Sequence, residues 1–252
     1  MDQLYEIYTN RLKRIDTEFV RYLHSKINWK SRLIVITGAR GVGKTTMLLQ
    51  HIKLNKIENH SLYLSADSIY FAENTLYNVA SKFCKLNGKF LFIDEVHKYK
   101  NWSVEVKMMY DNLPDLNIVV TGSSVLDISK GLEADLSRRA IAYNLEGLSF
   151  REYLNFTLGT NINSVSLQNI LSHSYSLPEN ISHPISYWVE YLKVGYYPFF
   201  KEDNFYTRLD NVVNQTLEVD IPTYANMNVS TSVKLKRLLY IIARSVPFKP
   251  NI

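Results

Sequence analysis

The chain has 252 residues, which is enough for one large domain or for a core with a small appendage. Hydrophobic residues make up 46% and charged residues 21%, a globular composition that excludes a wholly disordered chain. The single cysteine, Cys84, excludes an internal disulfide and a cysteine zinc cage. The N-terminal residues lack the apolar run of a signal peptide, and no stretch approaches the roughly 18 apolar residues of a membrane span. We therefore expect a soluble, cytoplasmic protein that does not enter a membrane.

The formal net charge of +5 comes from one end of the chain. Residues 221–252 contain no acidic residue, whereas residues 1–220 contain 24 basic and 24 acidic residues. The basic residues of the C-terminal stretch are Lys234, Lys236, Arg237, Arg244 and Lys249. We therefore do not expect residues 1–220 to present the basic face that nucleic-acid binding requires. The C-terminal stretch has two interpretations, a contact with nucleic acid or a solvated helix face.

In chain order, residues 4–29 place apolar side chains close to a helical period. The β-branched run RLIVIT (32–37) then predicts a buried strand, and GVGKTTMLLQHIKL (41–54) predicts a helix. Further strands are expected at 61–67, 89–94, 116–121 and 138–148, with helices at 74–86 and 101–113. Strands that alternate with helices indicate βαβ crossovers, and hence an α/β fold with a mainly parallel sheet.

The composition changes between residues 155 and 184, a stretch rich in Asn and Ser whose only charged residue is Glu179. We interpret this stretch as a loosely packed connection with a short helix at 166–171. The sequence then divides into an N-terminal helical segment packed on the core (1–30), the core (31–154), this connection (155–184) and a helical lid region (185–252).

The stretch GARGVGKT (38–45) matches the pattern G-x-x-x-x-G-K-[ST] between a predicted strand and a predicted helix, which is the context of a phosphate-binding loop. Its glycines let backbone N–H groups approach phosphate oxygens, and the helix N-terminus adds a favourable dipole. We expect Lys44 to reach the β- and γ-phosphates and the Thr45 hydroxyl to bind Mg²⁺. The expected nucleotide-binding residues are Gly38, Ala39, Arg40, Gly41, Val42, Gly43, Lys44, Thr45 and Thr46.

The stretch FLFIDEVHK (90–98) supplies the second half of the predicted site. Asp94 and Glu95 follow four apolar residues at the carboxyl end of a predicted strand, where open α/β sheets place their ligands. Asp94 is suited to hold Mg²⁺ through water, and Glu95 is suited to polarise an attacking water as a general base. A glutamate next to the metal-holding aspartate favours hydrolysis. The guanine-reading motif Asn-Lys-x-Asp is absent from the sequence.

Two later segments contain further candidates for phosphoryl chemistry. TGSS (121–124) ends the fourth predicted strand, and Thr121 or Ser123 could bind the attacking water or the γ-phosphate, unless these residues only terminate the strand. Arg138 and Arg139 could stabilise charge on the transferred phosphoryl group, in the same chain or in a neighbouring copy. The alternative is a pair of solvated arginines before a strand.

Three other residues have less defined roles. Arg40 could cover the phosphates or pair with an acid, and the sequence does not choose between these. Asp67 could orient water or metal. His97 could sense the γ-phosphate, but a surface histidine is the simpler interpretation.

In order along the chain, GARGVGKTT, FLFIDEVHKYKNW, VVTGSS and LSRRAIAYNLEGLSFREYL resemble a family of AAA-type P-loop ATPases of bacteria and archaea. The resemblance continues through YWVEYLKVGYYPFF to VPFKPN. It implies an additional-strand P-loop fold with sheet order 5-1-4-3-2 and a small helical lid. It also implies Thr45 and Asp94 as Mg²⁺ ligands, Lys44 as a phosphate ligand, Glu95 as the catalytic base and Ser123 as a sensor. Family members usually continue into a winged-helix region and a further C-terminal domain, sometimes nuclease-like, whereas this sequence stops at Ile252. The sequence does not decide whether it is a fragment.

The sequence therefore predicts an ATP hydrolase that uses ATP and Mg²⁺ to drive conformational change of attached domains or of a partner. Two alternatives stay open, a nucleotide-dependent switch with very slow hydrolysis and a nucleic-acid-associated ATPase that acts through a missing C-terminal domain. The preference for adenine follows from the resemblance and from the absent guanine motif. A homo-oligomer and an unidentified protein partner are both compatible with this prediction.

Overall fold

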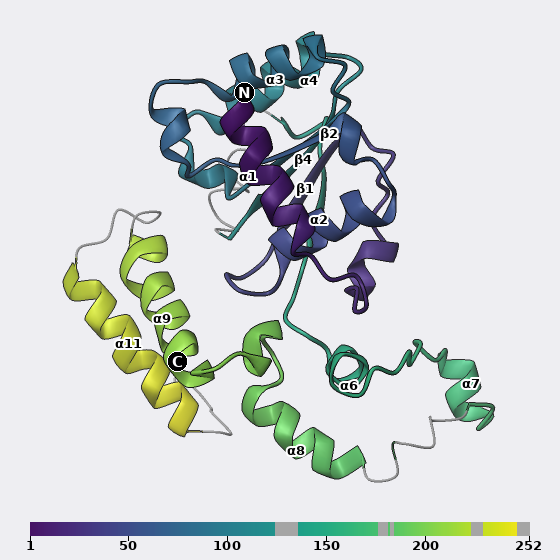
Figure 1. The fold of residues 1–252 in the computed structure, drawn as a ribbon. Helices are drawn as coiled ribbons and strands as arrows, with labels where there is room; N and C mark the ends of the chain where they lie inside the picture. Colours follow the sequence, from purple (N-terminus) through teal and green to yellow (C-terminus); the bar gives the residue numbers. More distant parts are fainter. Residues whose placement is uncertain (124–135, 176–180, 182–183, 223–228, 246–252) are drawn as a thin grey trace. The chain divides into compact units, whose positions relative to one another are not determined.

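The computed structural model describes residues 1–123, 136–175, 181, 184–222 and 229–245 (Figure 1). The chain divides into two compact units, Met1–Phe200 and Lys201–Ile252. The boundaries that the sequence suggests after residues 30, 154 and 184 are finer than this division and stay predictions.

A five-stranded sheet forms the centre of the first unit. Its strands are β1 (Leu33–Thr37), β2 (Ser61–Ser65), β3 (Phe90–Asp94), β4 (Asn117–Gly122) and β5 (Ile141–Asn144). Their order is β2-β3-β4-β1-β5 and all neighbours are parallel, which confirms the predicted fold class and the order 5-1-4-3-2. Because parallel strands end at the same edge of a sheet, the last residues of β1 and β4, Thr37 and Gly122, lie directly opposite each other.

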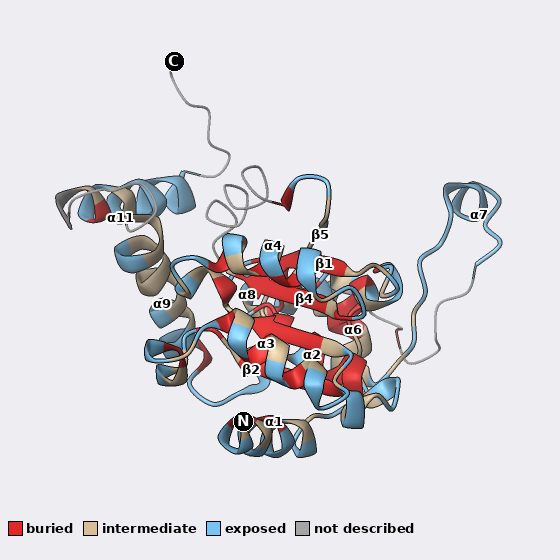
Figure 2. Ribbon diagram, turned by 90° about the horizontal axis from the view of Figure 1, so that it is seen from above, coloured by how far each residue is buried: buried red, intermediate tan, exposed pale blue. Residues whose placement is uncertain are grey.

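The sheet is the most buried part of this unit. All five residues of β1 are buried, as are four of the five in β3, in keeping with a parallel sheet covered on both faces. Figure 2 shows these strands as a buried layer next to helices whose outer faces are exposed. The edge strand β5 differs, because its residues are mostly exposed.

In the described part of the first unit, the α-helices are α1 (Asp2–Lys13), α2 (Lys44–Leu54), α3 (Leu76–Lys85), α4 (Trp102–Asn112), α6 (Phe150–Leu158), α7 (Leu167–Leu171) and α8 (Pro184–Val194). The predicted helices at 41–54, 74–86, 101–113 and 166–171 are confirmed. The sequence reasoning missed α6, although its start carries a capping box. The Ser149 hydroxyl accepts the backbone N–H of Glu152, and the Glu152 carboxylate accepts the backbone N–H of Ser149.

The helical period between residues 4 and 29 does not continue as one helix. Helix α1 ends at Lys13, and a turn follows in which the Asp16 carboxylate accepts the backbone N–H of Glu18 at 2.8 Å. The chain after α1 is held instead by α2, because the side-chain amide of Gln50 donates to the backbone oxygen of Asp16 at 2.8 Å. The turn at Asp16 and the contact with α2 together override the apolar periodicity.

The described part of the second unit contains the α-helices α9 (Phe205–Gln215) and α11 (Val229–Arg244). Helix α11 carries four of the five basic residues of the C-terminal stretch, while Lys249 lies outside the described residues. Its large apolar side chains, such as those of Leu238 and Tyr240, are exposed. Within the described parts of the chain, no helix is both long enough and apolar enough to cross a bilayer.

Candidate functional site

The predicted phosphate loop connects β1 to α2. Gly38, Gly41 and Gly43 have φ angles of 147°, 83° and 97°, which residues with a side chain rarely adopt. A Cβ atom at Gly38 would also collide with the backbone oxygen of Leu145. Helix α2 begins at Lys44, directly after Gly43, so its first N–H groups face the loop. The backbone therefore has the strand–loop–helix form that binds phosphate.

Lys44 holds its positive charge inside this loop. Its side chain is 4% exposed, and Nζ donates to the backbone oxygens of Gly38 at 2.9 Å and Ala39 at 3.0 Å. Arg40, in the same loop, is half-buried, and Thr46, in the first turn of α2, is exposed. The loop thus combines backbone donors with a positioned ammonium group, which suits the negative charge of a polyphosphate.

Asp94 and Thr45 meet at the carboxyl end of β3. Thr45 Oγ1 donates to Asp94 Oδ2 at 2.6 Å, and the buried carboxylate also accepts from Tyr63 Oη on Oδ2 at 2.8 Å and from Thr121 Oγ1 on Oδ1. Mg²⁺ prefers oxygen ligands, and it commonly takes one or two protein carboxylates together with phosphate oxygens and waters. The hydroxyl of Thr45 and the carboxylate of Asp94 therefore fit a Mg²⁺ ion bound with a nucleotide.

Glu95 extends from the end of β3 toward the loop. It has a φ angle of 50°, a left-handed conformation that is uncommon for a residue with a side chain. Its Oε1 lies 3.9 Å from Lys44 Nζ, and its Oε2 accepts the Ser123 hydroxyl at 2.9 Å and lies 3.5 Å from His97 Nε2. The His97 side chain is only 4% exposed, so the interpretation of His97 as a surface histidine is wrong. The fold thus brings Glu95 and Ser123 together. The sequence predicted both as site residues, but it predicted Ser123 as a contact of water or the γ-phosphate and not of Glu95.

Thr121 has a different environment from the one that the sequence suggests. It is fully buried, its hydroxyl donates to Asp94 Oδ1, and its Oγ1 accepts the backbone N–H of Glu95 at 3.2 Å. These contacts fix Asp94 and Glu95. They also direct the proton of the Thr121 hydroxyl to Asp94 and thus away from a phosphate or water. Asp67, after β2, is exposed and accepts the Ser65 hydroxyl at 2.5 Å.

Arg138 and Arg139 do not reach the phosphate loop of their own chain. They precede the first residue of β5, whereas the loop follows the last residue of β1, and these strands are parallel neighbours. The two positions therefore lie at opposite ends of the strands. The arginines are at the amino edge of the sheet, where the strands begin, and the loop is at its carboxyl edge, where they end. Arg139 pairs with Asp111 at 3.0 Å, and Arg138 is exposed. An arginine finger acting within one chain is therefore not supported, which leaves two alternatives, a finger supplied to a neighbouring copy and a solvated pair of arginines before the strand.

Arg21 is a buried residue beside the loop that the sequence reasoning missed. It is 5% exposed, its Nε donates to Glu152 Oε1 at 2.8 Å, and its Nη1 donates to the backbone oxygen of Val42 at 2.6 Å. Its Nη2 donates to the backbone oxygens of Glu146 at 2.7 Å and Gly147 at 2.9 Å. Arg21 therefore ties the phosphate loop to the start of α6.

Glu152 is the buried carboxylate that pairs with Arg21, and opposing effects act on its pKa. Burial by itself would raise the pKa of Glu152, but the hydrogen bond and charge of Arg21, with the backbone N–H groups of Ser149 and Tyr22, hold that pKa below its ordinary value. The capping-box pattern SFRE (149–152) was the available sequence signal for Glu152, whereas nothing near Arg21 in the chain identifies it.

An aromatic segment after α8 covers the phosphate loop. A Cβ atom at Gly41 would lie 2.7 Å from Cε1 of Phe199 and 3.6 Å from Cδ1 of Tyr197, and a Cβ atom at Gly43 would lie 3.8 Å from Cγ of Pro198. These glycines thus allow the close approach of a segment more than 150 residues away in sequence. This segment is a second feature of the site that the sequence reasoning did not identify.

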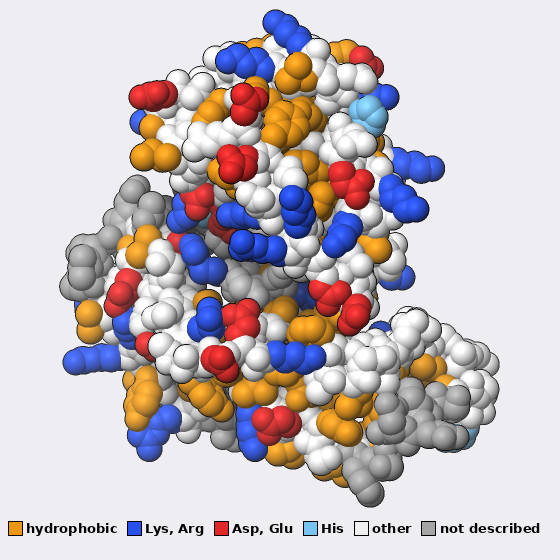
Figure 3. Space-filling model, in the orientation of Figure 1, with side chains coloured by type: hydrophobic (Ala, Val, Ile, Leu, Met, Phe, Trp, Pro, Cys, Tyr) orange, Lys and Arg blue, Asp and Glu red, His pale blue; other side chains and the backbone are white. Residues whose placement is uncertain are grey.

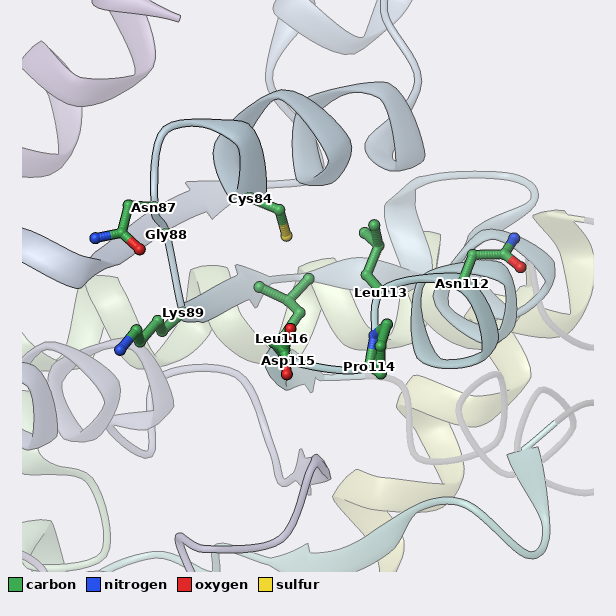
Figure 4. Close-up of a pocket in the computed structure, with 9 residues that line it drawn as sticks. All are labelled: Cys84, Asn87, Gly88, Lys89, Asn112, Leu113, Pro114, Asp115 and Leu116. Atoms are coloured by element: carbon green, nitrogen blue, oxygen red, sulfur yellow. The ribbon is translucent and has the colours of Figure 1, made fainter.

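A surface hollow lies at the amino edge of the sheet, away from the phosphate loop. It has a volume of about 540 Å³, and its lining includes Cys84, Lys89, Asp115 and Leu116 (Figure 4). Lys89 and Leu116 directly precede β3 and β4, so this hollow lies at the amino ends of the strands. It is therefore separate from the phosphate loop and the two acids.

The fold and the site together define an additional-strand P-loop domain of the nucleotide-binding class. The evidence is a glycine loop between β1 and α2, an Asp-Glu pair after β3, and the position of β4 between β1 and β3. Comparison with known proteins is more specific. Residues 30–154 match a family described as AAA domain, and the chain belongs to the AAA-type P-loop ATPase family.

Two relatives are uncharacterized proteins of Methanocaldococcus jannaschii. One is 28% identical over 257 residues, which cover 94% of this chain and 54% of the relative. The other is 31% identical over 179 residues, which cover 67% of this chain and 36% of the relative. The chain thus spans about half the length of the first relative and about a third of the second. A solved structure of Hsp104 with ATPγS and casein has a similar fold, with a TM-score of 0.50 at 13% identity, over 94% of this chain and 45% of that one.

Proposed function

We propose that this chain binds ATP together with Mg²⁺ and hydrolyses the ATP. The proposal is carried by the placement of Thr45, Asp94 and Glu95 around the phosphate loop, with Thr45 2.6 Å from Asp94 and Glu95 3.9 Å from Lys44. Lys44 and the loop N–H groups would bind the β- and γ-phosphates, and Thr45 and Asp94 would hold Mg²⁺. The bound Mg²⁺ would neutralise charge on the phosphate oxygens. The preference for adenine rests on the family.

Glu95 is the residue that we expect to activate water. The water oxygen forms a bond to the γ-phosphorus while the bond to the oxygen that bridges the β- and γ-phosphates breaks, and Glu95 accepts the proton that the water loses. The products are ADP and inorganic phosphate. The Ser123 hydroxyl and the backbone contact with Thr121 orient Glu95 for this step.

We also propose that a neighbouring copy supplies the arginine. Arg138 and Arg139 lie at the opposite edge of the sheet from their own loop, where a second copy of the chain can use them. We propose further that hydrolysis drives conformational change in attached domains or in a partner, an expectation that rests on the family.

A slow nucleotide-dependent switch is the second candidate. It is favoured by the contacts of Glu95 Oε2 with Ser123 and His97, because a carboxylate held on side chains of the protein can be kept out of the position in which it takes a proton from the attacking water. Direct nucleic-acid binding by residues 1–220 has less support. Their charges balance, and on the face that Figure 3 shows, acidic side chains lie among basic ones.

The test is ATP turnover per protomer with Mg²⁺, measured over a wide range of protein concentrations. Glu95→Gln should bind ATP as the wild type does, but its turnover should fall by about a hundredfold to ten-thousandfold, the usual contribution of a general base. Glu73→Gln, at an exposed glutamate, is the control and should change neither quantity. Equal turnover of the wild type and Glu95→Gln would contradict the proposal.

Two further results of the same assay separate the candidates. A turnover per protomer that rises with protein concentration supports an arginine from a neighbouring copy. Ser123→Ala decides between the hydrolase and the switch, since it lowers turnover if Ser123 positions Glu95 and raises turnover if Ser123 restrains it.

A further inference from the structure

Two side chains connect the N-terminal helix to Asp94. Arg11 on α1 donates from Nη1 to Tyr63 Oη at 2.6 Å, and its guanidinium carbon lies 5.2 Å from the centre of the Tyr63 ring. Tyr63 is on β2 and is 1% exposed, and its hydroxyl donates to Asp94 Oδ2 at 2.8 Å. A chain of hydrogen bonds thus runs from the surface of α1 to the carboxylate at the end of β3.

The direction of these hydrogen bonds follows from the chemistry of the groups. A guanidinium has only donors, so the Tyr63 oxygen accepts from Arg11, and the single proton of the Tyr63 hydroxyl is directed to Asp94. Hydrogen bonds to an ionised carboxylate are shorter and stronger than neutral ones, and burial strengthens them further. Asp94 Oδ2 therefore has a donor, Tyr63, that is independent of the phosphate loop.

We propose that Tyr63, held by Arg11, is a positioning residue for the Mg²⁺-binding carboxylate of Asp94. This inference rests on the proposed Mg²⁺-nucleotide site. Side chains that orient a metal ligand typically contribute about tenfold to a hundredfold to metal affinity. Helix α1 thereby contributes to the metal site through one exposed arginine, without contacting the phosphate loop through that residue.

The chain offers a matched control for Tyr63. Tyr63→Phe removes the hydroxyl that donates to Asp94 and keeps the buried ring. Tyr8→Phe makes the same change on α1, where Tyr8 is 3% exposed and donates its hydroxyl to the backbone oxygen of Glu58 at 3.2 Å. Arg11→Met removes the guanidinium and leaves the Tyr63 hydroxyl in place.

The measurement is Mn²⁺ affinity in the presence of ATP, from the electron paramagnetic resonance signal of unbound Mn²⁺, together with ATP affinity in EDTA. Tyr63→Phe should weaken Mn²⁺ binding about tenfold or more and leave ATP affinity in EDTA unchanged. Arg11→Met should weaken Mn²⁺ binding less, and Tyr8→Phe should leave it unchanged. Thermal unfolding of each variant shows whether it folds. If Tyr63→Phe does not fold, the Mn²⁺ affinity of Arg11→Met tests the proposal instead.

The results that would contradict this inference differ in what they overturn, the metal site or the role of Tyr63. If the wild type with ATP binds no more Mn²⁺ than ATP does alone, the proposed metal site is wrong and this inference falls with it. If the wild type binds Mn²⁺ and Tyr63→Phe binds it equally tightly, only the role of Tyr63 is overturned. An equal loss in Tyr8→Phe also overturns it, because the effect would then come from general loosening of α1.

Discussion

Charged side chains are buried at the carboxyl edge of the central sheet, whereas an ion pair at its amino edge is exposed. At the carboxyl edge, Lys44, Asp94 and Arg21 are each at least 95% buried, and each has hydrogen-bond partners within the protein. At the amino edge, the ion pair of Arg139 with Asp111 is exposed. Because a buried charge is costly unless it is paired, buried charges at one edge indicate where the fold is organised around a ligand. The hollow at the amino edge has no such group.

The largest expected effect is that of Arg21→Met. This change leaves the Glu152 carboxylate buried without its cation and removes a donor from the backbone oxygen of Val42. Removing one partner of a buried ion pair typically costs about 3 to 5 kcal/mol, so the free energy of unfolding should fall by that amount in urea denaturation. A loss below about 1 kcal/mol would show that the carboxyl edge is not held by this pair. Glu152→Gln keeps the shape of the partner but leaves the buried Arg21 guanidinium without its anion, so it should lose a similar amount.

A smaller effect is expected at His51, a buried residue of α2 whose ring stacks on Trp29 with centroids 3.7 Å apart. Burial, with a further contribution from His24, lowers the pKa of His51 to about 3. Its pKa in the unfolded chain is about 6.5. Between these values the unfolded chain binds a proton that the folded chain does not, so stability should fall as the pH falls from about 6.5 toward 3. The loss is at most about 1.4 kcal/mol per pH unit.

The pH prediction is checked by urea denaturation at pH 7, 6 and 5. His51→Gln should show a weaker loss of stability than the wild type over this range, since the difference between the two isolates the titration of His51. His60→Gln, at an exposed histidine, should follow the wild type. Identical pH dependence of the wild type and His51→Gln would contradict the prediction.

The smallest effect is expected for Arg139→Met at the amino edge. The ion pair with Asp111 has side chains that are 31% and 42% exposed, and exposed pairs typically contribute less than about 1 kcal/mol. The free energy of unfolding should therefore change by less than about 1 kcal/mol, in contrast to Arg21→Met. If the two variants lose similar amounts of stability, the comparison between the two edges does not hold.

The parts of the site that the sequence predicted are those with a local signal. The phosphate loop was identified from glycines, a lysine and a threonine within eight residues, and Asp94 and Glu95 from the apolar run before them. The strand order came from the family resemblance. The errors have tertiary causes, because His97 is covered by the folded chain around Glu95, and the helical period after Lys13 is interrupted by contacts with α2.

By itself, the sequence determined where the phosphate loop lies in the chain, since the conformation of such a loop depends on residues next to one another in the chain. The tertiary structure decided which distant side chains hold the site in place. Arg21 is 131 residues from Glu152, and Tyr63 is 52 residues from Arg11 and 31 from Asp94. Pairs so far apart leave no periodic pattern in one sequence, and only the packing of α1, the sheet and α6 brings them together.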